Sequence, residues 1–97
     1  MANYSLSSRA QYDLVGMYKY GIKFFGPDRA TKYLLDMEGF LEELAERPEL
    51  AKDASTIADS LKYYSYKAHV ISYQFENANE IFIIRILGKR MNFIEHL

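Results

Sequence analysis

The chain has 97 residues, of which 49% are hydrophobic, 15% aromatic and 26% charged. This length and composition fit one globular domain over residues 1–97 and leave no room for a second core or a separate cofactor module. Cysteine is absent, and two histidines are present. The composition therefore excludes disulfides, thiolate nucleophiles and cysteine-ligated zinc, and we expect neither a metal nor a cofactor.

The formal net charge of −1 is distributed unevenly along the chain. Residues 1–59 hold seven Lys/Arg and ten Asp/Glu, whereas residues 60–97 hold five and three. Dedicated nucleic-acid-binding proteins carry a larger basic excess, because phosphate neutralisation supplies most of their affinity. We therefore expect no direct sequence-specific nucleic-acid binding. The sequence has no apolar run of about 18 residues and no signal peptide, which predicts a cytoplasmic protein that does not enter a membrane.

A short strand at residues 4–6 is expected to lead into a helix, since Ser7 and Ser8 can each cap the first turn. The apolar stripe of this helix has spacings of four, three, four and three residues. The glycine within the stripe would let a second helix approach closely. The stripe consists of Ala10, Leu14, Met17, Gly21 and Phe24.

The segment 25–28, FFGPDRA in its wider context, separates this helix from a second one. Gly26 can adopt the left-handed conformation that ends a helix, and Pro27 suits the first turn of the next. Pro48 then ends the second helix, because a residue before proline disfavours helical geometry. Two helices joined by so short a turn should form an antiparallel hairpin. The second stripe consists of Ala30, Tyr33, Leu34, Met37, Leu41 and Leu44.

Beyond Pro48 the periodicity changes from helix to strand. A polar connection over residues 49–60, in which a weak helical turn fits, precedes three runs rich in aromatic and β-branched residues, at 61–66, 69–75 and 80–87. The last run is nearly continuously apolar, which predicts a central strand covered on both faces, one of them by the hairpin. We therefore expect an α+β fold in which an N-terminal strand and a helical hairpin precede a three-strand antiparallel meander that packs against the hairpin.

Arg85 interrupts the apolar character of the last strand. A guanidinium near the end of a buried strand often pairs with a carboxylate from a neighbouring element, and this structural role weighs at least as much as a binding role. Of the histidines, His69 is expected to be hydrogen-bonded and structural rather than a catalytic base, and His96 to be inert.

The segment 85–93, RILGKRMNF, mixes basic, aromatic and thioether groups, which suits a protein interface, although short basic runs are also common at solvated termini. The tyrosine-rich run 61–66 is a second candidate surface, because tyrosines often anchor interfaces. A sheet face under a helix explains these tyrosines equally well. The candidate target- or partner-binding residues are Lys62, Tyr64, Tyr66, Arg85, Lys89, Arg90, Met91, Asn92 and Phe93.

The order of elements, together with the phrases LSSRAQYDL, FFGPDRA, LEELAERPEL, KAHVISY and RILGKRMNF, resembles the ParE toxins of the RelE/ParE superfamily over nearly the whole chain. The chain departs from the family pattern at four positions. Ala51 and Lys62 stand where the family usually has glycine and arginine, and Gly88 and Asn92 stand where it usually has histidine and aspartate.

The resemblance implies the toxin of a type II toxin–antitoxin system that inhibits DNA gyrase and is not itself an enzyme. It also implies a ParD-like antitoxin, whose C-terminal segment wraps the toxin in a hetero-oligomer that represses its own operon. An apolar groove between hairpin and sheet should then be open in the free toxin.

Two alternatives stay open. RelE-like members of the superfamily are ribosome-dependent mRNA endonucleases, and that activity would need Lys62, Tyr66 and Arg85 to converge on one face. The place where nuclease relatives carry a C-terminal acid/base residue holds Gly88 or Met91, neither of which titrates, so no catalytic residue is assigned. The other alternative is a non-toxic antitoxin-binding relative, for which the four departures are modest evidence.

Overall fold

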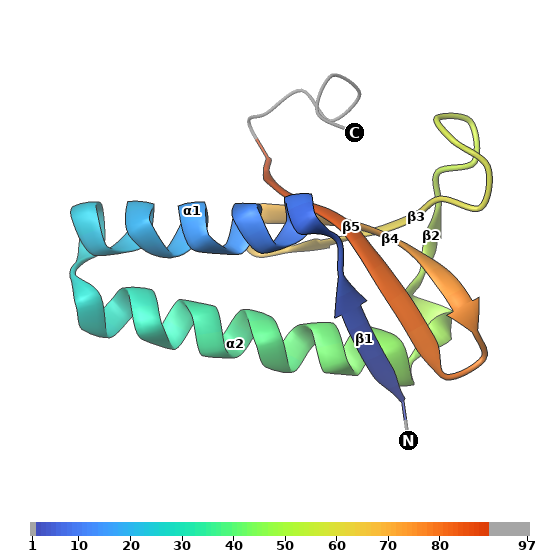
Figure 1. The fold of residues 1–97 in the computed structure, drawn as a ribbon, viewed down its shortest axis with the longest axis horizontal. Coiled ribbons are helices and arrows are strands. Elements are labelled where there is room, and N and C mark those ends of the chain that lie inside the picture. The colour runs from blue at the N-terminus through green and yellow to red at the C-terminus, as the bar shows by residue number, and fades with distance from the viewer. Residues whose placement is uncertain (1, 90–97) are drawn as a thin grey trace.

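The computed structural model describes residues 2–89, in which two helices pack side by side against a five-stranded sheet (Figure 1). This architecture confirms the predicted α+β fold. The elements are β1 (Asn3–Leu6), α1 (Ser8–Phe25), α2 (Pro27–Glu46), the short 3-10 helix η1 (Pro48–Leu50), β2 (Lys52–Asp53), β3 (Lys62–Tyr66), β4 (His69–Asn77) and β5 (Glu80–Gly88).

The strands lie in the order β1-β5-β4-β3-β2, so β5 is central, as predicted. The expected meander corresponds to β3, β4 and β5, which pair antiparallel. Two strands extend it. β1 pairs in parallel with β5, a connection that the intervening hairpin makes possible, because parallel neighbours need a long crossover. β2 pairs with β3 inside the connection that was expected to be polar and strand-free, and its two residues are too few to show a periodicity.

The start of α1 is tied directly to the central strand. The Ser7 hydroxyl accepts the Ala10 backbone N–H at 2.9 Å and donates to the carbonyl of Ile84 in β5 at 2.6 Å. At the other end, Gly26 closes α1 with a φ of 88°, a conformation that favours glycine. The predicted cap and turn are both confirmed.

The close approach of the two helices predicted from Gly21 is also confirmed. A Cβ atom at Gly21 would lie 3.0 Å from the Cβ of Ala30 on α2, so the two backbones meet here with no room for a further side chain. Both residues lie toward the tip of the hairpin, near the turn at Gly26.

The core lies between the hairpin and the sheet, and it contains most of the predicted stripes. The prediction that Phe24 belongs to the buried stripe of α1 is wrong, because its side chain is 56% exposed. The hairpin extends past the sheet in Figure 1, so the last turn of α1 has no strand beneath it. The fully buried members of the core are Ala10, Met37, Leu41, Leu44, Ala45, Ile71, Tyr73, Ile81, Ile83 and Ile86.

The prediction that β5 would be covered on both faces is wrong for its middle. Ile83 is buried on the helix side, whereas Phe82, which points to the opposite face, is only partly buried. The helices occupy one face of the sheet, so among residues 2–89 no helix covers Phe82. Neither helix within residues 2–89 has the combined length and apolar character that a membrane span requires.

Candidate functional site

The candidate Arg85 forms an internal ion pair. Its Nε and Nη2 atoms donate to the two carboxylate oxygens of Asp13 on α1, at 2.8 and 2.9 Å. Both side chains are 13% exposed. The same carboxylate accepts the backbone N–H of Ile86 at 2.9 Å, and its hydrogen bonds with the Arg85 guanidinium, together with its charge, raise the pKa of Arg85. The structural role considered for Arg85 is therefore realised, with α1 supplying the carboxylate.

The three candidates on β3 contact different partners. Lys62 lies 3.6 Å from the Asp53 carboxylate of β2. Tyr66 stacks on Phe40 of α2 with ring centroids 4.2 Å apart, and Tyr64 lies against the same ring at 5.5 Å. The two tyrosines thus belong to the sheet face under the helix. Lys62, Tyr66 and Arg85 each bind a separate partner, and β4 lies between the strands that carry them.

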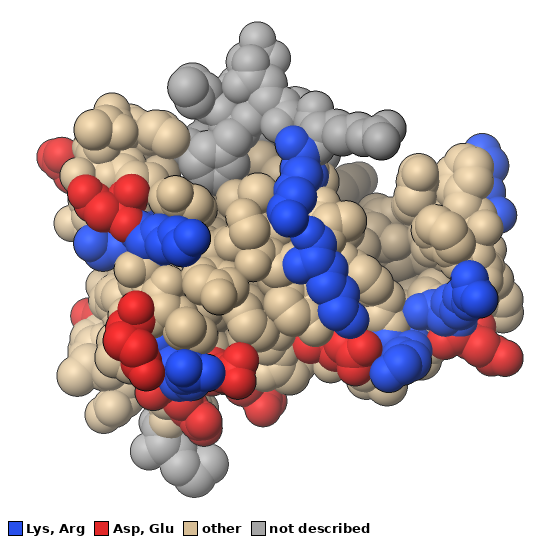
Figure 2. All heavy atoms as spheres, turned by 180° about the vertical axis from the view of Figure 1, so that it is seen from behind, with Lys and Arg blue, Asp and Glu red and all other residues tan. Residues whose placement is uncertain are grey.

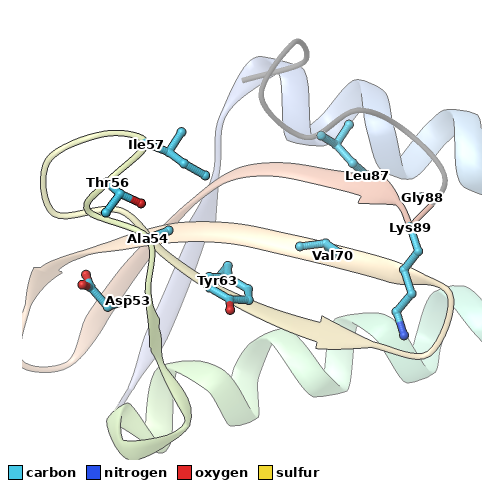
Figure 3. Close-up of a pocket in the computed structure, with 9 residues that line it drawn as sticks. All are labelled: Asp53, Ala54, Thr56, Ile57, Tyr63, Val70, Leu87, Gly88 and Lys89. Carbon is cyan, nitrogen blue, oxygen red and sulfur yellow. The ribbon is translucent and has the colours of Figure 1, made fainter.

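A shallow hollow of about 370 Å³ lies on the helix-free face of the sheet. Figure 3 shows Tyr63 and Val70 on its floor, with Thr56 and Ile57 of the β2–β3 loop on one side and the end of β5 on the other. Tyr63 is thus the tyrosine of this strand that faces away from the hairpin, and the sequence-based choice of Tyr64 and Tyr66 did not include it. Alternation along β3 was the available signal.

The segment RILGKRMNF is described only as far as Lys89. The Lys89 backbone N–H donates to the carbonyl of Ala68 at 2.9 Å, which places this lysine beside the β3–β4 turn. Its side chain is exposed and lines the hollow on the helix-free face. The other candidates of this segment, Arg90, Met91, Asn92 and Phe93, lie outside the described residues.

An apolar groove runs along the hairpin at the end of the sheet. It consists of two adjoining hollows of about 670 and 640 Å³ that share Met17, Tyr20, Ala68 and His69. The first hollow continues to Lys89 and the second to Arg29. We call this feature the hairpin groove. Its further lining residues are Tyr12, Asp13, Gly16, Ile86 and Gly88 in the first hollow and Gly21, Phe25, Ala30 and Tyr33 in the second.

The charges that line the hairpin groove are mainly positive. Arg29 and Lys89 lie in opposite hollows, and the single carboxylate of the lining, Asp13, is already bound to Arg85. On the face of the molecule that Figure 2 shows, a line of Lys and Arg side chains crosses a largely uncharged part of the surface. The described groove therefore favours an apolar partner that carries negative charge.

A hydrogen-bonded pair lies where the two hollows meet. The Tyr33 hydroxyl of α2 is 2.8 Å from Nδ1 of His69, the first residue of β4, and the ring centroids are 5.6 Å apart. Burial lowers the pKa of His69, and the Asp13 carboxylate offsets part of that change. Burial also raises the pKa of Tyr33. The prediction that His69 is hydrogen-bonded is confirmed.

The turn that precedes His69 is clamped onto α2 by Lys67. This residue has a φ of 52°, and its ammonium lies 3.4 Å from the Asp36 carboxylate. The same ammonium lies 5.4 Å from the Tyr33 ring centroid and 5.3 Å from that of Tyr66. These contacts hold the floor of the hairpin groove in place.

In the sequence analysis an apolar groove between hairpin and sheet was expected, but among the residues of the hairpin groove only Lys89 was assigned to binding. A signal was present: Tyr12, Gly16, Tyr20 and Phe24 recur every four residues on α1, which puts large aromatic side chains and a glycine on one line of the helix. Tyr20 is 60% exposed, and the Phe24 ring packs against it at a tilt of 38°, with ring centroids 4.5 Å apart. Exposed aromatics on such a line indicate a contact surface. Within residues 2–89, no three His, Asp or Glu side chains come together in a way that could hold a metal ion.

Comparison with known proteins agrees with this architecture. Residues 4–93 match the family described as the ParE toxin of the type II toxin–antitoxin system parDE. Toxin ParE1 of Caulobacter vibrioides is 29% identical over 97 residues, covering 100% of this chain and 99% of that protein. Toxin ParE1 of Mycobacterium tuberculosis is 24% identical over 91 residues, covering 94% and 93%.

A solved chain of the chromosomal ParDE TA system from P. aeruginosa has the same fold, with a TM-score of 0.74 at 18% identity, over 91% of this chain and 95% of that one. The family match extends over nearly all of the elements described above, from β1 through β5. The chain therefore belongs to the ParE toxin family of type II toxin–antitoxin systems.

Proposed function

We propose that this toxin inhibits DNA gyrase and is neutralised by a ParD-like antitoxin that occupies the hairpin groove. The observation that carries the antitoxin assignment is the groove itself, which is apolar, open and bordered by cations at both ends. The assignment of gyrase rests on membership of the ParE toxin family. The solved ParDE relative supports a partner of the ParD type.

The shape of the hairpin groove favours an amphipathic segment. Two adjoining hollows accept two sets of apolar side chains, and a helix presents such sets one turn apart on a single face. Exposed aromatic residues on α1, such as Tyr20, gain burial when the segment binds. An acidic segment would also be attracted to Arg29 and Lys89, so apolar burial and charge attraction would both favour its binding.

The candidate gyrase surface lies on the helix-free face of the sheet, on the side of Lys89 that faces away from the hairpin groove. Lys62, Tyr64, Tyr66 and Arg85 are engaged in contacts within the fold. Lys89 is exposed and borders the hollow that contains Tyr63 on the helix-free face (Figure 3). We assign this hollow, with Lys89 and the segment that follows it, to the target. Lys89 lines both surfaces, so an antitoxin in the groove would compete with the target for it.

A supercoiling assay with purified gyrase tests the target. We expect the toxin to inhibit supercoiling and to trap cleaved plasmid, and Arg90→Ala/Met91→Ala or Lys89→Ala to weaken this effect. Lys19→Ala, an exposed lysine on α1 that lines neither surface, is the matched control. No effect at high molar excess would remove gyrase from the proposal, and translation-dependent mRNA cleavage would then favour the nuclease alternative.

Antitoxin binding is tested separately. Tyr20→Glu puts a charge on the shared wall of the two hollows and should weaken binding by at least tenfold. Val15→Glu makes the same change at a 52% exposed position of the same helix outside the groove lining, and should leave binding unchanged. Hydrogen exchange should show protection of α1 and of residues 67–69 on antitoxin addition, and equal exchange in both states would contradict the groove assignment.

A further inference from the structure

His69 offers a single free polar atom to the hairpin groove. The Tyr33 hydroxyl lies 2.8 Å from Nδ1 of His69. A phenol has one hydrogen, and we assign it to this contact, with Nδ1 as the acceptor. The neutral imidazole then carries its own hydrogen on Nε2.

Nε2 of His69 is open to the groove. Among the described residues, Tyr73 Oη is the only buried side-chain nitrogen or oxygen without a hydrogen-bond partner. Nε2 has no partner among the described hydrogen bonds, so it is accessible, and His69 lines both hollows. A donor thus sits in the middle of an apolar surface, and a partner that covered it without an acceptor would lose affinity.

The charges around His69 indicate the kind of acceptor. The titratable groups that line the same hollows are Tyr12, Asp13 and Tyr20 from α1, Arg29 and Tyr33 from α2, and Lys89 after β5, and Lys67 with its partner Asp36 lies beside them at the β3–β4 turn. Both carboxylates in this set are paired, Asp13 with Arg85 and Asp36 with Lys67. The remaining charges are cationic, so an anionic acceptor is favoured over a neutral one.

We propose that the antitoxin segment in the groove places a carboxylate against Nε2 of His69, between two apolar side chains that fill the two hollows. The inference rests on the proposed antitoxin function of the groove. On a helical segment, the apolar residues would lie three or four positions on either side of the acidic one. His69 is then a specificity-determining residue, because it requires a particular group at one position of the partner.

The carboxylate gives binding a definite pH dependence. An adjacent anion favours the imidazolium, so the pKa of His69 is higher in the complex than in the free toxin. Complex formation then takes up a proton, and affinity rises as the pH falls from 8 to 6. Each unit by which binding raises the pKa of His69 corresponds to at most a tenfold change in Kd. An uncharged partner that only covered the ring would give the opposite sign, because added burial disfavours the imidazolium.

The test measures the Kd of the purified full-length toxin for the ParD-like antitoxin encoded alongside it, at pH 6, 7 and 8. We expect the wild type to bind about three- to tenfold more tightly at pH 6 than at pH 8. His69→Gln keeps a donor at the position of Nε2 but does not titrate, so its Kd should be independent of pH. His96→Gln removes the other histidine and should behave as the wild type.

A wild-type slope of the opposite sign, or an unchanged slope in His69→Gln, would overturn the inference. If Tyr20→Glu also binds normally, the groove assignment fails with it; if Tyr20→Glu abolishes binding, the groove assignment stands and only the carboxylate is refuted.

Ring-nitrogen NMR of the wild type gives a readout that needs no variant. It should show Nε2–H in the free toxin and a higher His69 pKa in the complex, and an unchanged or lower pKa would contradict the proposal.

Discussion

Arg85 of β5 and Asp13 of α1 form a two-point ion pair that joins the central strand to the hairpin across 72 residues of sequence. Because Asp13 also accepts the backbone N–H of Ile86, one carboxylate holds both the side chain and the backbone at the end of the strand. This end of β5 borders the hairpin groove, so the pair positions one wall of it.

Removing the carboxylate should destabilise the fold. Asp13→Asn removes the charged half of an ion pair whose two side chains are each 13% exposed, and the free energy of unfolding should fall by about 3 kcal/mol in urea denaturation. Asp59→Asn, at an exposed position, should change it by less than about 0.5 kcal/mol. The double variant Asp13→Leu/Arg85→Met should be more stable than Asp13→Asn, and equal losses in these two would argue against the broken ion pair as the cause.

Replacing Tyr73 with phenylalanine should stabilise the protein. Its ring is fully buried and its hydroxyl has no hydrogen-bond partner among the described residues, so Tyr73→Phe should raise the free energy of unfolding by about 1 kcal/mol at pH 7. Tyr64→Phe, on the neighbouring strand and only partly buried, is the control and should change stability less. A loss of stability in Tyr73→Phe would reveal a partner for this hydroxyl.

Tyr73 also predicts a loss of stability at high pH. Burial raises the pKa of Tyr73 from 10 to about 12, with a smaller contribution from Tyr64. The unfolded chain therefore releases this proton at lower pH than the folded protein does, and stability falls as the pH rises from 10 toward 12. Denaturation across this range should show a weaker decline for Tyr73→Phe than for the wild type. Parallel declines would contradict the burial of an un-ionised Tyr73.

The same substitution should have opposite effects at two glycines. Gly21→Ala would bring a Cβ within 3.0 Å of the rigid Ala30 Cβ, and the strain should exceed the gain in helix propensity, with a net loss of about 1 kcal/mol. Gly39→Ala, in α2, meets no atom within 4 Å and should stabilise the protein by up to about 1 kcal/mol. Thermal unfolding measures both, and a stabilised Gly21→Ala would mean that the helices separate without cost.

Charge at the ends of the hairpin groove should control the rate of antitoxin association. Arg29→Glu and Lys89→Glu should each lower the association rate constant several-fold at low salt, with a smaller difference at high salt, because screening weakens long-range attraction. Lys19→Glu makes the same change outside the groove and should have a smaller effect. Stopped-flow measurements at several salt concentrations check this, and equal rates for all three variants would exclude electrostatic steering toward the groove.

Local patterns in the sequence were enough to predict the helices, their caps, the turn at Gly26 and the three antiparallel strands. Each depends on residues within a few positions of one another: the apolar spacing along a helix, the Ser7 cap, or the run of β-branched residues in β5. They also identified Arg85 as the charge within the central strand that required compensation. The family resemblance rested on the same local phrases and is confirmed over residues 4–93.

The tertiary structure alone decided which residues meet. The parallel pairing of β1 with β5, the contact of Tyr33 with His69 and the pairing of Asp13 with Arg85 join positions far apart in sequence. The hairpin groove exists because α1 extends past the sheet edge while the β3–β4 turn and Lys89 close its floor. Such contacts depend on the packing of whole elements, for which local periodicity carries no information, so the family resemblance implied an apolar groove, but the residues that line it and its open His69 nitrogen emerge only in three dimensions.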